Sequence, residues 1–356
     1  MANAEAFVAA PGGLPFVVPR RPAVRQVRQP TFTPTIRAQP MRGFDATYTD
    51  IVDYIVRITD EIWRDRAIGR IYETYDAVCM VLSSYGVVRA ADDIVASTVA
   101  SLNAFPDGTT EHVNVAWSGD ENDFYTSHLG IGRSTNLGQS AYGPATGRYV
   151  VQRFVADCVS RDNRIHTEWL VRDAGAQVRQ LGLDPDTIAR QIAAAPAVEL
   201  PVFAAAIAPP RGPLDLPVTT VDGWIRHMFH ELWNRRRLDR LSDFYAPDLI
   251  AFSGGGRTVT GLRGIAALIT NILTAVADAA MTVEHVCHSN EADGVVVAVR
   301  WLLQGTTRPG GVLGNVTSGL PVNMMGMSHL RFAGPNIVEE WTVFDEVGVL
   351  VGAYRA

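Results

Sequence analysis

A six-residue motif that occurs twice constrains this sequence more than any other feature. Glu-Trp-x-Val-x-Asp begins at Glu168 and again at Glu340, a spacing of 340 − 168 = 172 residues. In a strand, alternate side chains point to the same face, so the Trp, Val and Asp of each copy would share one face. A carboxylate among apolar groups must be paired, be neutral or face a cavity. The motif therefore predicts a pocket wall in each copy.

The similarity between the two parts of the chain extends well beyond the motif. The matching positions are 61–63 with 231–233, Tyr75 with Tyr245, and 111–113 with 284–286. Their spacing stays close to 172 residues over more than a hundred positions. Self-similarity at a fixed spacing is typical of a duplicated structural unit. The sequence therefore predicts two copies of one domain.

Length and composition bound the class of protein. The 356 residues suffice for two domains of ordinary size, and 47% hydrophobic with 19% charged residues is typical of a globular chain. No apolar run is long enough to span a bilayer, and the start lacks the pattern of a secretory signal. Cys79, Cys158 and Cys287 are few, odd in number and widely spaced, which favours reduced thiols. We therefore expect a cytoplasmic protein that does not bind membranes.

Charge and motif content exclude several kinds of chemistry. The net charge is −6 and gives no nucleic-acid footprint, and every one of the 31 basic residues is arginine. Without lysine there is no Schiff-base, pyridoxal or phosphate-loop lysine. The segment 285–288 (His-Val-Cys-His) lacks the partner residues that metal-ligand spacing requires, and Gly254-Gly255-Gly256 fits a turn better than a phosphate cradle. We expect no metal and no cofactor.

The order of the expected elements divides the chain. Residues 1–42 form a flexible arm rich in Pro and Arg, and 184–217 form a helical and Pro-rich linker. Each expected domain, 43–183 and 218–356, has helical periodicity first and alternating strand patterns afterwards. Asp162-Asn163 predicts a tight turn between the last two strands of the first domain. This order predicts an α+β fold.

The element order and several motifs resemble the SnoaL-like polyketide cyclases of the nuclear transport factor 2-like superfamily, over about 45–183 and 220–356. The resemblance rests on segments 142–147, 168–173 and 179–182 in the first copy, and on segments 305–307, 319–321 and 340–345 in the second. The resemblance implies two tandem cone-shaped domains, each a curved antiparallel sheet with N-terminal helices closing one end. It also implies intramolecular aldol ring closure without metal or cofactor, with an acid at Asp173 and Asp345 moving the proton.

Four residues are candidates for acid/base catalysis. Asp173 and Asp345 would have their proton affinity raised by an apolar pocket, with His329 and His128 as assisting groups from neighbouring strands. A structural role is the alternative for each: a carboxylate holding a turn or an arginine, or a histidine on a half-exposed strand. The candidates for lining the pockets are Trp169, Trp341, Trp63, Trp233, Tyr75, Tyr245 and Arg300.

Two classes of function remain open from the sequence. The first is a cofactor-independent enzyme that acts on a small apolar carbonyl compound by aldol cyclisation, isomerisation, dehydration or hydrolysis. The second is a non-catalytic protein that binds a small ligand or serves as a scaffold. In either case the expected partner is a small molecule, not nucleic acid, and the two domains form an intramolecular pseudo-dimer that can assemble further into homo-oligomers.

Overall fold

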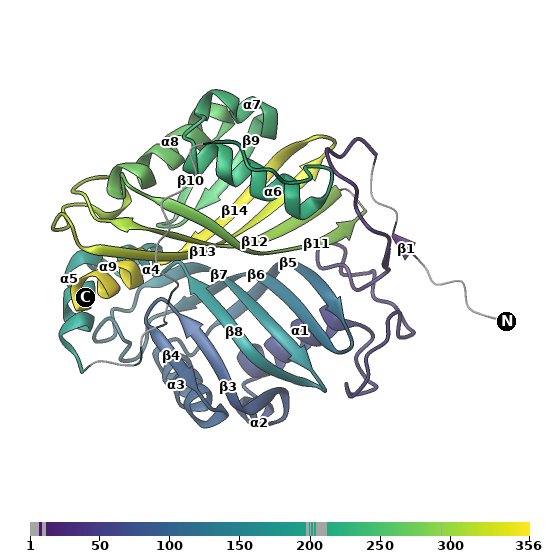
Figure 1. Ribbon diagram of the computed structural model, residues 1–356. Coiled ribbons are helices and arrows are strands. Elements are labelled where there is room, and N and C mark those ends of the chain that lie inside the picture. Colours follow the sequence, from purple (N-terminus) through teal and green to yellow (C-terminus); the bar gives the residue numbers. More distant parts are fainter. Residues whose placement is uncertain are drawn as a thin grey trace.

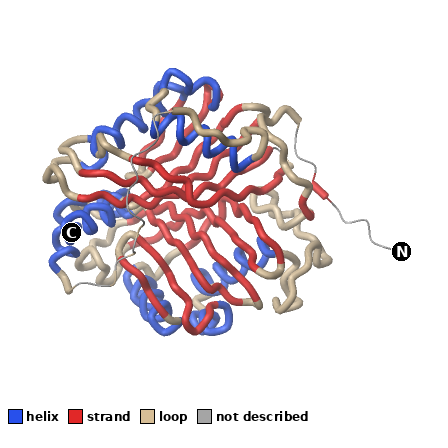
Figure 2. Tube along the Cα trace, in the orientation of Figure 1, coloured by secondary structure: helices blue, strands red, loops and turns tan. Residues whose placement is uncertain are grey.

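The computed structural model describes residues 7–8, 12–196, 199, 201, 203, 212–292 and 294–356. Figure 1 and Figure 2 show strands running through the middle of the molecule and helices on its outer sides. We call residues 43–183 the N-terminal half and residues 218–356 the C-terminal half. In the first figure the C-terminal half lies above the N-terminal half.

The two halves repeat the same order of elements. The N-terminal half contains α1 (Ile51–Thr59), the π-helical turn η1 (Asp60–Arg64), η2 (Ile68–Arg70), α2 (Ile71–Thr74), β3 (Tyr75–Ser83), β4 (Gly86–Arg89), α3 (Ala91–Ala104), β5 (Thr109–Asp120), β6 (Asp123–Thr135), β7 (Tyr149–Arg161), β8 (Arg164–Arg172) and α4 (Ala174–Gln180). The C-terminal half contains α6 (Val221–Phe229), η3 (His230–Asn234), η4 (Leu238–Arg240), α7 (Leu241–Phe244), β9 (Tyr245–Ser253), β10 (Arg257–Thr260), α8 (Gly261–Ala275), β11 (Ala280–Glu291), β12 (Gly294–Thr306), η5 (Gly311–Leu313), β13 (Pro321–Ala333), β14 (Asn336–Phe344) and α9 (Glu346–Arg355). Between the halves lies α5 (Pro185–Ala194), and the N-terminal segment holds the short strands β1 (Phe7–Val8) and β2 (Arg21–Pro22).

Local sequence explains where the first helix begins. Asp50 is the N-cap of α1, and its carboxylate accepts a hydrogen bond from the Asp53 N–H at 2.8 Å. This bond satisfies one of the donors that the first helical turn leaves free. Ile51, Tyr54 and Ile55 recur at helical spacing and are buried. The helix expected in this region is confirmed, and it passes directly into the π-helical turn η1.

Twelve strands form one curved, unclosed sheet in the order β10-β9-β14-β13-β12-β11-β5-β6-β7-β8-β3-β4. The pairing differs from the fully antiparallel sheet expected, because β3 pairs with β8, and β9 with β14, in parallel. Those strands approach the sheet after a helical segment instead of a hairpin, which permits the parallel direction. Among the residues that the structure describes, the two halves pair along the sheet at one position, where His288 of β11 is opposite Trp117 of β5.

Each half of the sheet has two buried faces. We call the face that packs against the helices of its own half the concave face; in the N-terminal half it includes Val115 and Phe124, which pack with α1. We call the other face the junction face, because there side chains of both halves form one apolar cluster. Its buried members are Val113, Leu129, Ile131, Val155, Val171, Met325, Met327 and Val343. The two parts of the sheet therefore pack back to back.

The described part of the N-terminal arm contacts both halves. Phe16 is 6% exposed and lies edge-on to the rings of Trp224 and Phe332 in the C-terminal half. Arg21 donates hydrogen bonds to the carbonyl of His288 at 2.6 Å and to that of Trp117. The arm thus crosses the place where the sheet joins the two halves.

Turn and linker positions follow the local sequence. Asp162 and Asn163 have φ of 49° and 65° between β7 and β8, as the hairpin expected there requires. Gly255 and Gly256, at φ of 74° and 73°, form the turn between β9 and β10. In the linker, α5 begins at the N-cap Asp184, whereas residue 202 and residues 204–211 lie outside the described part of the chain. No described helix has the length and hydropathy needed to cross a membrane.

Candidate active site

Asp173, the first predicted acid, holds the two halves together. It follows β8 as the N-cap of α4, is 1% exposed, and accepts a hydrogen bond from the Ala176 N–H at 3.1 Å. The N–H groups of Gly255 and Gly256, from the turn of the opposite half, also donate to it at 2.7 and 3.0 Å. Burial raises the pKa of the Asp173 carboxyl, while these three hydrogen bonds oppose the rise. The carboxylate therefore joins a helix start in one half to a turn in the other.

Asp345 occupies the corresponding position in the C-terminal half. It is the N-cap of α9 and accepts from the Gly348 N–H at 2.8 Å and from the Tyr85 hydroxyl, across the junction, at 3.4 Å. It has fewer donors than Asp173, and burial raises its pKa to about 7. Its side chain is 2% exposed. The structure thus places both predicted acids where the halves meet.

His329 lies on the junction face, between the halves. Its Nδ1 is 2.9 Å from Oδ1 of Asn114 and its Nε2 is 3.0 Å from the Ser127 hydroxyl, both in the N-terminal half. An amide oxygen only accepts, so Nδ1 carries the hydrogen and Nε2 accepts from Ser127. Burial lowers the pKa of His329 to about 3. The ring is therefore neutral, and both of its nitrogens are hydrogen-bonded. In the strand register His329 of β13 is opposite Trp341 of β14, four residues before Asp345.

The predicted pocket-lining residues divide between the two faces. Trp169, Trp341 and Arg300 are on the junction side: the Arg300 guanidinium lies 3.7 Å from the Trp169 ring centroid, and Trp341 stacks on Phe252 at 3.9 Å. The other four lie on the helix side of the sheet. The Tyr75 hydroxyl donates to the buried Glu168 at 3.0 Å, and the Tyr245 hydroxyl donates to the half-buried Glu340 at 2.8 Å. Trp63 and Tyr75 pack against the same apolar cluster, and Trp233 stacks on Trp301 at 6.5 Å.

His128 is the one predicted catalytic residue on a concave face, and two residues that were not predicted join it. Its Nε2 is 2.9 Å from Nδ1 of His112 on β5, and the two rings are stacked. Nε2 of His112 is in turn 3.0 Å from Oδ1 of Asp60, at the start of η1. Asp60 also forms an ion pair with Arg64 at 2.9 Å. The elements η1, β5 and β6 thus each contribute one residue to a chain of hydrogen bonds, which we call the relay (Asp60, His112 and His128).

The chemistry of the relay fixes its tautomers. The carboxylate of Asp60 accepts, so Nε2 of His112 carries the hydrogen and its Nδ1 accepts from Nε2–H of His128. This leaves Nδ1 of His128 as the proton acceptor at the end of the relay, with no hydrogen-bond partner among the described residues. Burial, together with the neighbouring imidazoles, lowers the pKa of His128 well below its ordinary value. His128 is therefore a neutral base at neutral pH.

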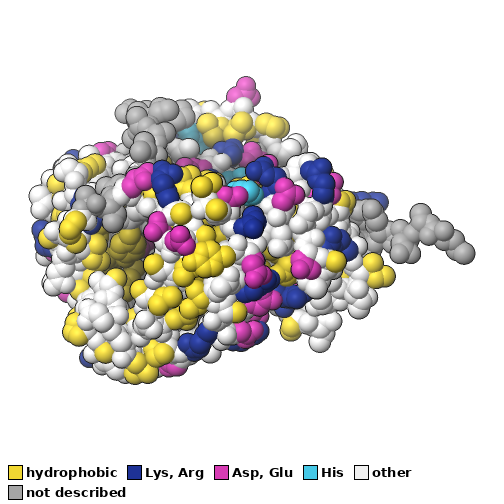
Figure 3. All heavy atoms as spheres, turned by 90° about the horizontal axis from the view of Figure 1, so that it is seen from below, with side chains coloured by type: hydrophobic (Ala, Val, Ile, Leu, Met, Phe, Trp, Pro, Cys, Tyr) yellow, Lys and Arg dark blue, Asp and Glu magenta, His cyan; other side chains and the backbone are white. Residues whose placement is uncertain are grey.

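The concave face around the relay is partly exposed in the N-terminal half, although His128 itself is only 2% exposed. His112, Phe154, Ala156, Leu170 and Arg172 are all half-buried. Figure 3, which views the molecule from the side of the N-terminal half, shows hydrophobic side chains gathered on this side. A neutral imidazole beside half-exposed apolar groups suits a ligand that is largely apolar.

The corresponding face of the C-terminal half is filled instead. The strands β6 and β12 have equal lengths and start at 123 and 294, so His128 corresponds to Val299 and Gly130 to Trp301. Val299 and Trp301 are each 1% exposed and belong to the large apolar core of that half. A relay of this kind therefore exists on the concave face of only one of the two described halves.

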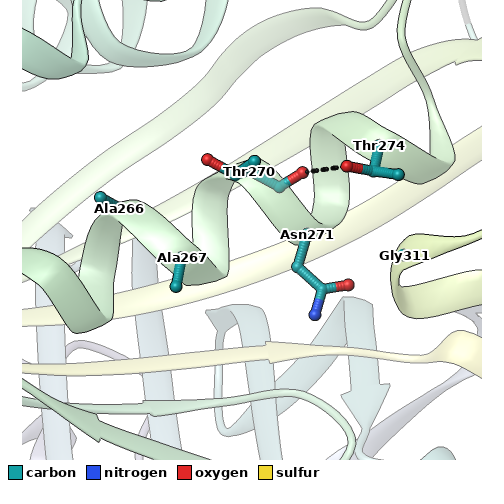
Figure 4. Close-up of a pocket in the computed structure, with 6 residues that line it drawn as sticks. All are labelled: Ala266, Ala267, Thr270, Asn271, Thr274 and Gly311. Carbon is teal, nitrogen blue, oxygen red and sulfur yellow. Dashed lines mark hydrogen bonds between the residues drawn. The ribbon is translucent and has the colours of Figure 1, made fainter.

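Another hollow lies on the outer side of α8 and has different properties. It is a groove of about 570 Å³. Figure 4 labels the residues that line it, Ala266, Ala267, Thr270, Asn271, Thr274 and Gly311. None of these side chains exchanges protons near neutral pH. The groove therefore offers no acid/base chemistry, and the relay is the better candidate site.

Simple alternation could not bring His112 and His128 together. Near the turn, β5 and β6 pair in a register that sets Asn114 opposite Leu129, but a bulge at Val113 then sets His112 opposite Gly130. The extra residue turns His112 onto the face that carries His128. The available signal was the presence of two histidines on neighbouring strands, together with a glycine that leaves space beside them.

The structure also corrects two correspondences inferred from the sequence. The match of 111–113 with 284–286 pairs His112 with His285, and the spacing of 172 residues pairs His128 with Arg300. The strand bounds and the matching bulges instead give Val299 and Val283 as the counterparts, and His285 corresponds to Asn114. A difference of one residue reverses the face, so Arg300 points to the junction.

No metal centre emerges from the described residues. They contain no group of three or more His, Cys, Asp or Glu side chains arranged to hold an ion. The segment 285–288 lies within β11, where His285 stacks on Tyr125 at 3.5 Å. The buried Cys79, Cys158 and Cys287 are free thiols.

The fold is mixed α+β with a large curved and unclosed sheet, which confirms the α+β fold expected from the sequence. Residues 224–351 match the family model described as SnoaL-like polyketide cyclase. This match covers most of the C-terminal half and confirms, for this part of the chain, the resemblance predicted from the motifs. No curated protein matches the sequence significantly.

Solved structures align with single portions of the chain. A candidate SnoaL-like polyketide cyclase from a Jannaschia species covers 38% of this chain and 92% of its own, at 18% identity and a TM-score of 0.34. A phenazine biosynthesis-related protein from Pseudomonas aeruginosa covers 37% and 85%, at 20% identity and a TM-score of 0.30. A candidate polyketide cyclase from Streptomyces antibioticus covers 35% and 91%, at 24% identity and a TM-score of 0.29.

Proposed function

We propose that the protein is an enzyme that transfers protons on a small apolar carbonyl compound, and that its active site is the concave face of the N-terminal half. The observation that carries the proposal is the relay, in which two hydrogen bonds of 2.9 and 3.0 Å connect His128, His112 and Asp60. A common arrangement for acid/base catalysis is a base that a second group holds in position, with a carboxylate that balances the positive charge forming on the base.

The relay explains how a weakly basic imidazole can remove a carbon-bound proton. Nδ1 of His128 takes the proton next to the carbonyl group, which leaves an enolate on the substrate. The positive charge that forms on His128 is shared with His112 through their hydrogen bond and is balanced by the Asp60 carboxylate. Such stabilisation acts only as charge develops, so it accelerates the chemical step.

The fate of the enolate sets the reaction type. In an aldol cyclisation, the enolate carbon attacks a second carbonyl carbon of the same molecule, and the alkoxide that forms takes the proton back from His128. Return of the proton to a different carbon gives an isomerisation. Loss of the β-hydroxyl group from the enolate gives a dehydration, in which the proton on His128 passes to the leaving oxygen and water is released. Each of these reactions uses side chains of the protein alone and needs no cofactor.

We further propose that the chain is a tandem pair of SnoaL-like domains, 43–183 and 218–356, that form an intramolecular pseudo-dimer. The support is the repeated order of elements, the equal lengths of corresponding strands and the recurrence of the Tyr–Glu hydrogen bond in both halves. The family model covers the half whose concave face is filled. The proposal that the N-terminal half is a SnoaL-like domain therefore rests on the structural repeat between the two halves.

In this proposal the remaining predicted catalytic residues have structural roles. Asp173 and Asp345 connect each helix start to the opposite half, and His329 connects β13 to Asn114 and Ser127. Of the four candidates only His128 stays in the proposed active site, where it is the base instead of the assisting group expected from the sequence. Domain 218–356 then serves as the support for the active domain.

The competing function is a non-catalytic protein that binds a small ligand. Exchange of the α-hydrogens of β-tetralone in deuterium oxide, followed by proton NMR, separates the two. The enzyme is expected to accelerate exchange in proportion to its concentration, and to lose this effect on heat denaturation. Binding of the ketone without faster exchange would favour the competing function.

A further inference from the structure

Arg172 is a charged residue on the same concave face as the relay. It is the last residue of β8, half-buried, and pairs with Phe154 of β7. The Phe154 ring is in edge-on contact with that of His128, with ring centroids 5.5 Å apart. Leu170, two residues earlier on the same face, packs with the helices of the N-terminal half. The guanidinium group therefore belongs to the surface that the relay faces.

This guanidinium has no hydrogen bond, ion pair or ring contact with any part of the chain that the structure describes. Most other arginines near the junction are engaged, for example Arg179 with Glu346 at 2.5 Å. Glu168, four residues earlier on the same face of β8, has a carboxyl that accepts from the Tyr75 hydroxyl at 3.0 Å. Burial raises the pKa of Glu168, whereas the hydrogen bond from Tyr75 and the charge of Arg172 oppose the rise. Glu168 therefore acts on Arg172 only through space and forms no hydrogen bond or ion pair with it.

The C-terminal half has an apolar residue at the corresponding position. The strands β8 and β14 correspond residue by residue, so the counterpart of Arg172 is Phe344. Phe344 is fully buried and packs near Trp301 in the apolar core of its half. In the N-terminal half the same position carries the charge of Arg172. Burying that charge costs free energy unless a partner compensates it. The arginine and the relay occur together, in the same half.

We propose that Arg172 binds a carboxylate of the ligand, and hence that the substrate is an apolar carboxylic acid carrying a separate carbonyl group. This inference rests on the proposed function, because it takes the concave face of the N-terminal half as the ligand site. An arginine fork matches a carboxylate with two parallel hydrogen bonds. The apolar neighbours Phe154, Ala156 and Leu170 suit the hydrocarbon part of such an acid and not a heavily charged phosphate compound.

The strand register also sets the reach of the ligand. Arg172 pairs with Phe154, and Phe154 pairs with Gly130, so the backbones of Arg172 and Gly130 lie two strand spacings apart, about 10 Å. His128 is on the same strand and face as Gly130. The carboxylate therefore binds several bonds away from the carbon that loses its proton, and serves to orient the substrate.

A binding experiment with the full chain tests this inference without requiring catalysis. Benzoate and its neutral isostere benzamide are titrated by calorimetry or by ligand-observed NMR. The parent is expected to bind benzoate at least about tenfold more tightly than benzamide, because the charged hydrogen bonds form with benzoate alone. Arg172→Gln is expected to remove this preference, and Arg172→Lys to keep part of it. Arg263→Gln, which removes an exposed arginine of α8, is the matched control and should behave as the parent.

The outcomes are distinct from those of the proposed function. His128→Gln should keep the benzoate preference while losing proton exchange. Equal binding of both probes by the parent, or an unchanged preference in Arg172→Gln with a native circular dichroism spectrum, would overturn the inference. Tighter binding of inorganic phosphate than of benzoate would overturn it as well. A preference that depends on Arg172 in a protein without exchange activity would support the carboxylate site and contradict the proposed function instead.

Discussion

Gly130 of β6 lies beneath the ring of Phe154 on the neighbouring strand, so that a Cβ added to Gly130 would be 2.4 Å from Cζ of that ring. The C-terminal half inverts this pair. Trp301 stands at the counterpart of Gly130, and a Cβ added to the facing Gly326 would be 2.1 Å from the Trp301 ring. One aromatic ring over one glycine thus occupies each concave face. The indole is fully buried, whereas Phe154 is half-exposed beside the relay.

This packing predicts that alanine substitutions at two glycines of β6 have unequal effects on the free energy of unfolding. Gly130→Ala is expected to displace Phe154 and to lower the free energy of unfolding by about 1–3 kcal/mol, because inserting an atom into a filled space forces side chains to move. Gly132→Ala is the control, since a Cβ there meets nothing closer than 3.8 Å. Urea unfolding of both variants measures the difference. Equal midpoints for the two variants would argue against this arrangement of Phe154.

Asp173→Asn tests the connection between the halves. A neutral amide oxygen accepts the three N–H groups less strongly than a carboxylate does, and its NH2 group faces donors. We expect a loss of about 1–3 kcal/mol in the free energy of unfolding. Hydrogen exchange followed by mass spectrometry should show faster exchange at Gly255 and Gly256 than in the parent. Unchanged protection of that turn would show that Asp173 does not hold it.

The effect of Asp345→Asn on the free energy of unfolding should change with pH. The folded pKa of about 7 lies above the unfolded value of about 3.9. The stability that protonated Asp345 contributes is therefore present below about pH 4 and is lost as pH rises through 7. The full change is on the order of 4 kcal/mol. The stability of Asp345→Asn relative to the parent should thus increase from pH 5 to pH 8 in denaturant titrations. A difference that stays constant with pH would rule out this titration.

The pH profile of α-hydrogen exchange should reflect the position of His128. Burial lowers its pKa, so the imidazole stays unprotonated below the ordinary histidine value of about 6.5. We expect exchange catalysed by the protein to remain constant down to at least about pH 6, and to fall only at more acidic pH. A fall centred between pH 6.5 and 7 would indicate that a different, solvated group is the base.

The sequence predicted those features that depend on periodicity and turn chemistry. The alternating patterns marked β8 and β14, and Asp162-Asn163 marked the hairpin between β7 and β8. The repeat paired Tyr75 with Tyr245, and both hydroxyls donate to the glutamate that opens the repeated motif.

The positions of the predicted acids could not be derived in the same way. Alternation places Asp173 on the face of Trp169, but β8 ends at Arg172 and Asp173 instead begins a helix. Both faces of the sheet are buried, so an apolar face by itself does not reveal whether it borders a ligand site or another half. The Trp169 face borders the other half. The relay depends in addition on the bulge at Val113, which no local pattern marks.

The central claim is that the relay is the base of an acid/base enzyme, and the rate of α-hydrogen exchange in β-tetralone measures it most directly. His128→Gln and Asp60→Asn are compared with the parent and with His166→Gln, a control on β8 whose ring lies outside the relay. Positioned acid/base groups contribute about a hundredfold to ten-thousandfold in rate. We predict a loss of at least a hundredfold in His128→Gln, a smaller loss in Asp60→Asn, and parental exchange in His166→Gln, with all melting temperatures close to that of the parent. Parental exchange in a folded His128→Gln variant would contradict the account.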